Sequence, residues 1–166
     1  MKINWPWNKP KDNYLVLLLS ILLAQLVGGI GSLFTISAIT NWYIYLDKPF
    51  FSPPNWVFGP VWTLLYALIG ISAYLVWRQY RFGKKSRPFW HVYTAQLVLN
   101  ALWSFIFFGL KFTGLAFMEI LAMWYFIART IQEGKKLSPW SAYLLYPYLA
   151  WVTFASLLNL AIWFLN

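Results

Sequence analysis

The chain of 166 residues contains no cysteine, a single histidine and only four acidic residues. The absence of cysteine excludes disulfide bonds and thiolate metal sites, and it leaves the redox compartment undetermined. With so few histidine and carboxylate groups, the sequence lacks the ingredients of a metal centre or of a Ser-His-Asp arrangement. His91, close to Arg87, is better explained as a residue at a membrane interface than as a haem or metal ligand. Conventional acid–base or metal catalysis is therefore not expected.

The sequence is instead rich in long apolar segments. Hydrophobic residues make up 61% of the chain and its mean hydropathy is +0.57, whereas soluble domains have about 45–50% apolar residues. Five segments between charged positions are long enough to cross a hydrocarbon core, which takes about 17–25 helical residues. The sequence predicts an all-α membrane protein, a five-transmembrane-helix bundle, with helices at about 14–39, 55–77, 88–110, 112–131 and 138–165.

The first apolar segment is expected to stay in the protein rather than to be removed as a signal peptide. It is much longer than the roughly 7–15 residues of a signal h-region, and no A-x-A pattern closes it. Residues 14–166 are thus interpreted as a single five-helix domain. Residues 1–13 receive no role beyond that of a cytoplasmic lead-in.

Basic residues are unevenly divided between the two sides of the predicted bundle. One side holds the N-terminus and the loops after the second and fourth helices, with Lys2, Lys9, Lys11, Arg78, Arg81, Lys84, Lys85, Arg87, Arg129, Lys135 and Lys136. The other side holds only Lys48 and Lys111. The positive-inside rule predicts a cytoplasmic N-terminus and an extracytoplasmic C-terminus. The net charge of +9 then reflects contact with anionic lipid, and no nucleic-acid partner is expected.

Prolines indicate where helices are interrupted. The stretch DKPFFSPPNWVFGPVWTLLY, residues 47–66, predicts a proline-rich extracytoplasmic loop that leads into the second helix. Asn55 is expected to cap that helix, and Gly59-Pro60 to kink it or delay its start. Ser138-Pro139 is a helix-start pattern, and Pro147 is expected to bend the fifth helix.

Polar and small residues inside the spans indicate contacts between helices. Gln96, Asn100 and Ser104 recur at a spacing of four and are expected to face inward. Glu119 is the one acidic residue within a span; we expect it to be protonated or hydrogen-bonded, and favour a structural hydrogen bond to a neighbouring helix for it and for Asn159. The small residues Ser20, Ala24, Gly28 and Ser32 favour close packing inside the bundle over a dimer interface.

Aromatic residues are in excess, with 12 Trp, 11 Tyr and 14 Phe. Belts at the two membrane interfaces account for some of them. Trp62, Trp103 and Trp151 lie further inside the spans, where they would either fill the core or line a pocket for a flat apolar ligand. For any one tryptophan taken alone, ordinary packing is the simpler interpretation.

Three stretches resemble the tryptophan-rich sensory protein and translocator protein family: WYIYLDKPFFSPPNWVFGPVWTLLY (42–66), AQLVLNALWSFIFF (95–108) and LLYPYLAWVTFASLLN (144–159). The resemblance implies a five-helix membrane bundle, commonly a homodimer in bacteria, whose cavity binds porphyrins and related flat ligands beneath a lid formed by the first loop. A bacterial cell membrane fits best, because the tyrosine and basic residue of the animal cholesterol motif are missing at the end of the fifth helix.

Carried over by position, the resemblance implies a set of ligand-contacting residues. These are Trp62, Trp151, Asn100 and the small residue Ala155 in the cavity, and Trp42, Tyr43, Pro49 and Pro53 in the lid. Lys48 is expected to attract the propionates of a tetrapyrrole. No cofactor is required; porphyrin or haem is the expected ligand.

Three functions follow from these expectations. The first is a binding protein that transports or senses tetrapyrroles. The second is a light- and oxygen-dependent porphyrin-degrading enzyme that uses Trp62 and Trp151 as electron donors, although oxidative damage to a bound ligand would have the same appearance. The third is a structural bundle with its cavity filled by its own side chains.

Overall fold

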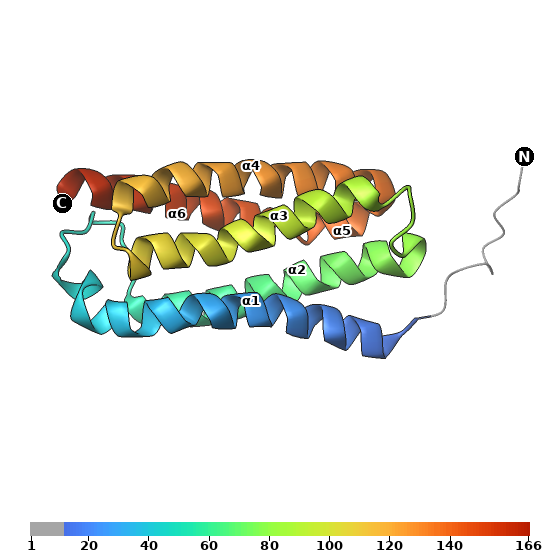
Figure 1. The fold of residues 1–166 in the computed structure, drawn as a ribbon, viewed down its shortest axis with the longest axis horizontal. Helices are drawn as coiled ribbons and strands as arrows, with labels where there is room; N and C mark the ends of the chain where they lie inside the picture. The colour runs from blue at the N-terminus through green and yellow to red at the C-terminus, as the bar shows by residue number, and fades with distance from the viewer. Residues whose placement is uncertain (1–11) are drawn as a thin grey trace, which may run out of the picture.

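A computed structural model describes residues 12–166, which fold into long helices lying side by side along one axis (Figure 1). The helices are α1 (Tyr14–Asn41), α2 (Phe58–Tyr80), α3 (Arg87–Ser104), α4 (Thr113–Leu137), α5 (Pro139–Tyr143) and α6 (Tyr146–Leu165). Five helical stretches are long and apolar enough to cross a membrane. The predicted fold class is confirmed. The predicted lead-in at 1–13 lies almost entirely outside the described residues.

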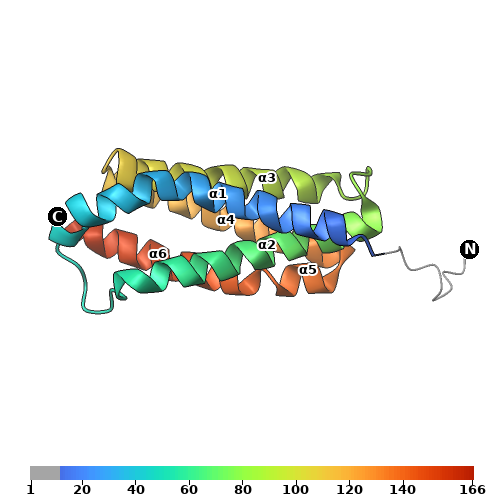
Figure 2. The ribbon, with the colours of Figure 1, turned by 90° about the horizontal axis from the view of Figure 1, so that it is seen from below.

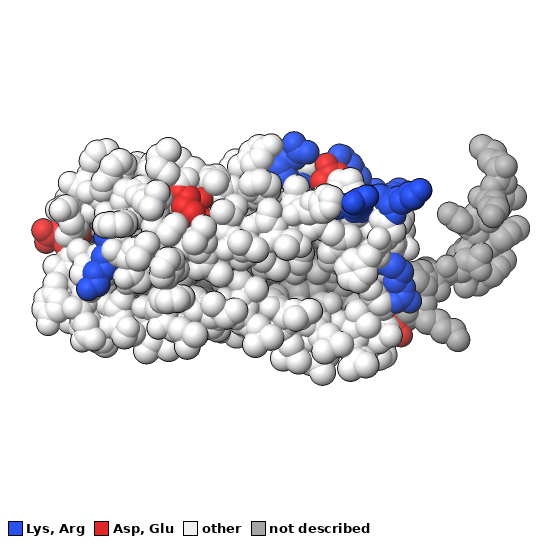
Figure 3. All heavy atoms as spheres, in the orientation of Figure 1, with Lys and Arg blue, Asp and Glu red and all other residues white. Residues whose placement is uncertain are grey.

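Charged residues gather at one end of the bundle. Figure 3 shows Lys and Arg side chains clustered there. We call this the basic end; in the described residues it carries Arg78, Arg81, Lys84, Lys85, Arg87, Arg129, Lys135 and Lys136. The opposite end, called the loop end, carries the 42–54 loop and the last residues of α6. These two ends correspond to the two sides of the bundle that were predicted from the order of the spans.

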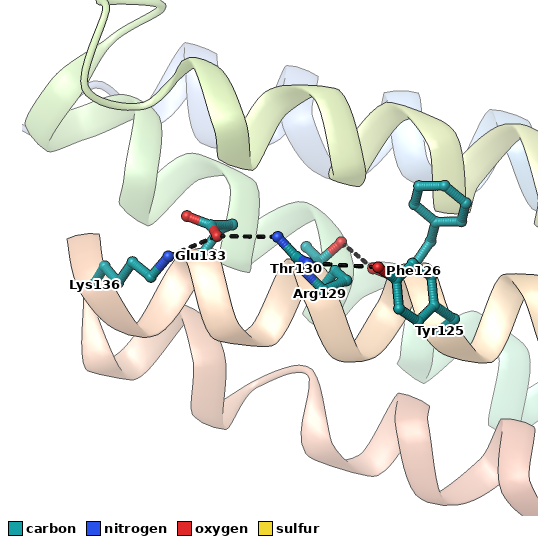
Figure 4. Close-up of polar contacts among 6 residues, drawn as sticks. All are labelled: Tyr125, Phe126, Arg129, Thr130, Glu133 and Lys136. Carbon is teal, nitrogen blue, oxygen red and sulfur yellow. Dashed lines mark hydrogen bonds and ion pairs between the residues drawn. The ribbon is translucent and has the colours of Figure 1, made fainter.

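Helix α4 extends to Leu137, beyond the predicted boundary at 131. Its last turns carry an ion-pair ladder, in which Lys136 Nζ lies 2.7 Å and Arg129 Nη2 3.7 Å from Glu133 Oε1 (Figure 4). In the same stretch Thr130 Oγ1 donates to the Phe126 carbonyl oxygen. Exposed pairs of this kind contribute only about 0.3–0.5 kcal/mol each. These pairs nevertheless favour continuation of the helix beyond residue 131. The sequence there is too polar for hydropathy to predict a helix.

The start of α2 differs from the prediction. Asn55 does not cap the helix: it lies in a short 3₁₀ turn, Asn55–Val57, that precedes Phe58, and it makes no capping bond. Helix α2 begins at Phe58, three residues after the predicted start, and runs unbroken through Gly59-Pro60, because Pro60 falls in the first turn, where its missing N–H would have no helical partner.

The fifth span is interrupted close to Pro147, where a bend was predicted. Helix α5 ends at Tyr143 and α6 begins at Tyr146, so that Pro147 falls in the first turn of α6. Two backbone bonds bridge the break: Leu144 N donates to the Trp140 carbonyl in the α-helical pattern, and Leu145 N donates to the Ala142 carbonyl in the tighter 3₁₀ pattern. Ser138 precedes α5 as expected, although its side chain makes no capping bond.

Helix α1 touches the bundle through glycines. A Cβ at Gly70 of α2 would lie 2.6 Å from Ile21 Cα and 2.7 Å from the Ser20 carbonyl oxygen, so α1 and α2 are in backbone contact there. Ala24 is fully buried and Gly28 packs directly on the Tyr66 ring. Ala24 and Gly28 therefore pack inside the bundle, as predicted for the small-residue stripe.

Replacing Gly70 by alanine should lower the stability of the bundle. The added methyl group meets backbone atoms that cannot rotate away, and overpacking of this kind costs about 1–3 kcal/mol. Thermal unfolding in detergent would measure the loss. Gly29→Ala is the matched control, because a Cβ there meets nothing within 4 Å; equal losses in both variants would contradict the close contact.

Candidate functional site

A cavity of about 510 Å³ lies inside the loop-end half of the bundle and is partly open to its surroundings. Its wall is mostly apolar and comes from α1, α2, α3, α4 and α6, with Tyr43 and Asn55 from the segment between α1 and α2. Ligand pockets typically enclose about 300–1,000 Å³. The bundle thus contains a site of ligand size and is not filled by its own side chains.

Five of the residues predicted from the family resemblance lie on the cavity wall: Tyr43, Trp62, Asn100, Trp151 and Ala155. They come from the loop, α2, α3 and α6, and only the fold brings them together. The other predicted residues do not line the cavity; these are Trp42, Lys48, Pro49 and Pro53, all in the 42–54 loop.

The 42–54 loop covers the end of the cavity. Tyr43 is 4% exposed, and its ring packs on Phe107 at 6.3 Å between centroids. Burial raises the pKa of the Tyr43 hydroxyl, so this group remains neutral at physiological pH. Lys48 folds back onto its own loop, where its Nζ donates to the carbonyl oxygens of Leu46 (2.9 Å) and Ile44 (3.2 Å).

The loop is also fastened to α6. The Asn166 side chain accepts a hydrogen bond from the Asp47 N–H and donates to the Asp47 carbonyl oxygen, both at 3.0 Å. Phe51 meets Phe154 edge-on, with 6.2 Å between ring centroids. The loop therefore acts as a fixed cover in this structure.

A chain of polar side chains begins at the floor of the cavity, where Tyr66 and Asn100 line it, and continues into the buried core. The Tyr66 hydroxyl donates to Asn100 Oδ1, Asn100 Nδ2 donates to the Tyr148 hydroxyl (2.9 Å), and Tyr148 donates to Gln96 Oε1 (2.9 Å). Tyr148 is completely buried. Buried polar groups in a low dielectric need such partners. The chain ties α2, α3 and α6 together and confirms that Gln96 and Asn100 face inward.

Aromatic rings form the walls above this floor. Trp62 stacks on Tyr66, with 5.4 Å between centroids, and meets Tyr148 edge-on at 6.2 Å. Trp151 of α6 meets Phe58 edge-on at 6.0 Å, one helical turn before Trp62 on α2. These geometries hold the rings in fixed orientations, so that the wall is rigid and flat-sided.

The three cavity tryptophans differ in what their indole N–H groups do. Trp103 Nε1 donates to Asn159 Oδ1 (3.1 Å), and Asn159 Nδ2 donates to the Thr113 carbonyl oxygen (2.8 Å). Among the described residues no acceptor pairs with the N–H of Trp62 or Trp151, and that of Trp151 is buried. Trp103 is therefore committed to holding α3, α6 and α4 together, as predicted for Asn159, whereas Trp62 and Trp151 keep a free donor.

Other cavity residues were missed by sequence reasoning. Phe58, Tyr66 and Met123 line the wall, and so does the loop-end half of α1, including Gly29 and Ser32. Tyr66 could have been found, because it lies one helical turn after Trp62 and so faces the same side of α2. The contribution of α1 had no chemical signal beyond its small residues.

Glu119 does not make the interhelical hydrogen bond that was predicted for it. Both of its carboxyl oxygens are buried, and no hydrogen-bond partner within residues 12–166 reaches them. The favoured interhelical hydrogen bond is thus wrong. Because an unpaired carboxylate in a low dielectric is very unfavourable, the protonated acid is the form that fits this position.

These features define a class: a multi-pass membrane protein whose five-span helical bundle encloses an aromatic, amide-floored cavity. Residues 20–164 match the model of the TspO/MBR family, and the chain belongs to that family. The resemblance inferred from three sequence stretches is confirmed.

Relatives from all three domains of life share most of the chain. It is 46% identical to the tryptophan-rich protein TspO of Archaeoglobus fulgidus, over 93% of this chain and 99% of that protein. It is 42% identical to the human translocator protein, over 81% and 80%. Identity to the tryptophan-rich sensory protein of Cereibacter sphaeroides is 40%, over 72% and 73%.

Tyr148→Phe should destabilise the protein by about 1–3 kcal/mol, the range for buried groups left without a partner. An ordinary interhelical bond in a membrane contributes only about 0.6 kcal/mol on average. The larger value is expected because one substitution strips a partner from both Asn100 and Gln96. Unfolding in detergent is the measurement, with Tyr143→Phe as control since Tyr143 is exposed. Equal stabilities would show that the polar floor contributes nothing.

Proposed function

We propose that the protein is an intramembrane receptor that binds flat apolar ligands in its cavity, with the tetrapyrroles porphyrin and haem as the ligand class, and that it transports or senses them. The observation that carries this proposal is the indole N–H of Trp151, which is buried on the cavity wall without an acceptor among the described residues, beside Trp62, whose N–H also has no acceptor there. A buried donor without a partner costs about 1–3 kcal/mol. A ligand with acceptor atoms at its edge would relieve that cost.

The cavity chemistry suits a macrocycle held by its faces and edges. The Trp62–Tyr66 stack offers a flat aromatic surface. Lys48 would reach propionates only by giving up its bonds to Leu46 and Ile44.

The alternative is light- and oxygen-dependent degradation of the bound porphyrin. The observation that favours it is the stacking of two oxidisable rings, Trp62 and Tyr66, on the cavity wall. The excited porphyrin would take one electron from the Trp62 indole, and oxygen, the oxidant of the reaction, would take that electron from the reduced porphyrin. This activity needs no acid–base groups.

A porphyrin titration tests the receptor. Protoporphyrin IX added in the dark to the purified protein should give saturable binding, followed by its main absorption band. Trp62→Phe and Trp151→Phe should each raise Kd by about threefold to tenfold, because a hydrogen bond contributes about 0.5–1.5 kcal/mol. Trp103→Phe should lower stability more than affinity, since its N–H is committed to Asn159.

Trp140→Phe is the control, because Trp140 is exposed at the start of α5 and lies outside the cavity wall. Absence of saturable dark binding would contradict the receptor. Illumination of the complex then separates the alternatives: an unchanged spectrum leaves the receptor and removes the enzyme. Bleaching at the parent rate in both tryptophan variants would show that these residues are not electron donors.

We also propose that the protein lies in a bacterial cell membrane with its basic end in the cytoplasm, so that the 42–54 loop and the end of α6 are extracytoplasmic. The supporting observation is the clustering of Lys and Arg at the basic end. The homodimer implied by the family resemblance stays a prediction.

Cysteine labelling tests the orientation, since the chain has no native cysteine. Phe50→Cys, in the loop at a fully exposed position, should react with a membrane-impermeant maleimide in intact cells. Lys84→Cys, exposed at the basic end, should react only after permeabilisation. The reverse pattern would invert the proposed orientation.

A further inference from the structure

Two sides of the cavity are closed. At the loop end, the 42–54 loop is held by the paired bonds between Asn166 and Asp47 and by the buried Tyr43. Toward the basic end, Gly28 packs on Tyr66, and the Tyr66–Asn100–Tyr148 chain forms the floor. These contacts narrow the cavity in both directions along the bundle, with Asn55 the one exposed lining residue outside α1 and α2 among the described residues.

The remaining side, between the loop-end halves of α1 and α2, is open. Five residues line the cavity and are also exposed at the molecular surface: Asn55, just before α2, and four on the two helices, Gly29 and Ile36 of α1 and Gly59 and Thr63 of α2. A Cβ placed on Gly29 or Gly59 meets nothing within 4 Å. We call the opening between these four residues the lateral slit. The ribbons of α1 and α2 separate toward the loop end (Figure 2).

The slit has a defined lower edge. Gln25 Nε2 of α1 donates to the Thr63 carbonyl oxygen of α2 at 2.8 Å. One turn further toward the basic end lies the backbone contact of Gly70 with Ile21. The backbones of the two helices are thus close below Gln25; above it the last close contact is Gly28 on the inward-facing Tyr66 ring.

The slit opens toward lipid and not toward water. It lies within two spans, and the neighbouring α1 residues Leu26, Ile30 and Leu33 are exposed apolar side chains. The polar side chains Gln25, Ser32, Thr35 and Thr63 line the cavity beside it. Polar groups at membrane depth commonly mark a substrate path. Here they would accompany the polar edge of a mostly apolar molecule.

We propose that the cavity is entered sideways from the hydrocarbon core of the bilayer through the lateral slit, so that its ligands are amphiphiles that first dissolve in the membrane. This inference rests on the proposed receptor function and deepens it by naming the route and the ligand class. It explains why the loop end can stay covered while the cavity exchanges its contents.

A substitution in the slit tests the route. Gly29→Phe places a ring in open space, so the fold should tolerate it. The probe is protoporphyrin IX preloaded into lipid vesicles. Its transfer to protein in nanodiscs is followed by quenching of tryptophan fluorescence, with visible light that excites the porphyrin excluded. Association and dissociation should both slow by about tenfold, equivalent to roughly 1.4 kcal/mol in the barrier, with Kd nearly unchanged. A narrowed route slows both directions equally.

Two controls separate this route from others. Leu33→Phe lies on the same helix but outside the cavity wall and should exchange at the parent rate. Asn166→Ala releases the loop and should also leave the rates unchanged. Faster exchange in Asn166→Ala, or parent rates in Gly29→Phe, would overturn the lateral route, as would equal slowing in Leu33→Phe. If the parent protein shows no saturable binding, the receptor function itself fails.

Discussion

The backbone contact between α1 and α2 at Gly70 determines where the cavity lies. Helix α1 has the smallest buried share of the five spans, so it depends on a few contacts with the bundle. Those contacts change partner along the helix: toward the basic end Ile21 meets Gly70 of α2 and the Asn13 N–H bonds to the Tyr74 hydroxyl, whereas toward the loop end Gly31 meets Ser104 of α3 and Phe34 meets Phe105. Because α1 packs on α2 at one end and on α3 at the other, it diverges from α2 toward the loop end (Figure 2). That divergence leaves space beneath the loop.

The polar floor is compatible with a membrane because its groups satisfy one another. In a bilayer no water is present to pair with a stranded amide or hydroxyl, and each unpaired group is costly. Tyr66, Asn100, Tyr148 and Gln96 come from three helices and leave only Gln96 Nε2 without a partner. The same bonds fix the Tyr66 ring on which Trp62 stacks. Bundle stability and cavity shape therefore depend on the same side chains.

Hydropathy and proline positions predicted the five spans and the break at Pro147, because both signals are local. The family resemblance predicted that Trp62, Asn100, Trp151 and Ala155 share one cavity, as the structure has them. No local sequence pattern could predict this, because the residues lie on three different helices. The α1 wall and the role of Trp103 were beyond reach, since they depend on where one helix diverges from another and on which acceptor meets an indole. Asn55 was misjudged for a related reason: a turn of 3₁₀ helix supplied the start that its side chain was expected to supply.

Whether a tryptophan is structural or available to a ligand depends on its acceptor and not on its depth. Trp62, Trp103 and Trp151 all line the cavity, and sequence alone treats them alike. The indole N–H of Trp103 donates to Asn159, and the Asn159 side chain in turn donates to the carbonyl oxygen of Thr113 at the start of α4. Trp62 and Trp151 are held by ring contacts alone, with Tyr66, Tyr148 and Phe58. Ring packing orients an indole without using its N–H. A cavity built in this way keeps rigid walls and still presents free donors to whatever enters from the bilayer.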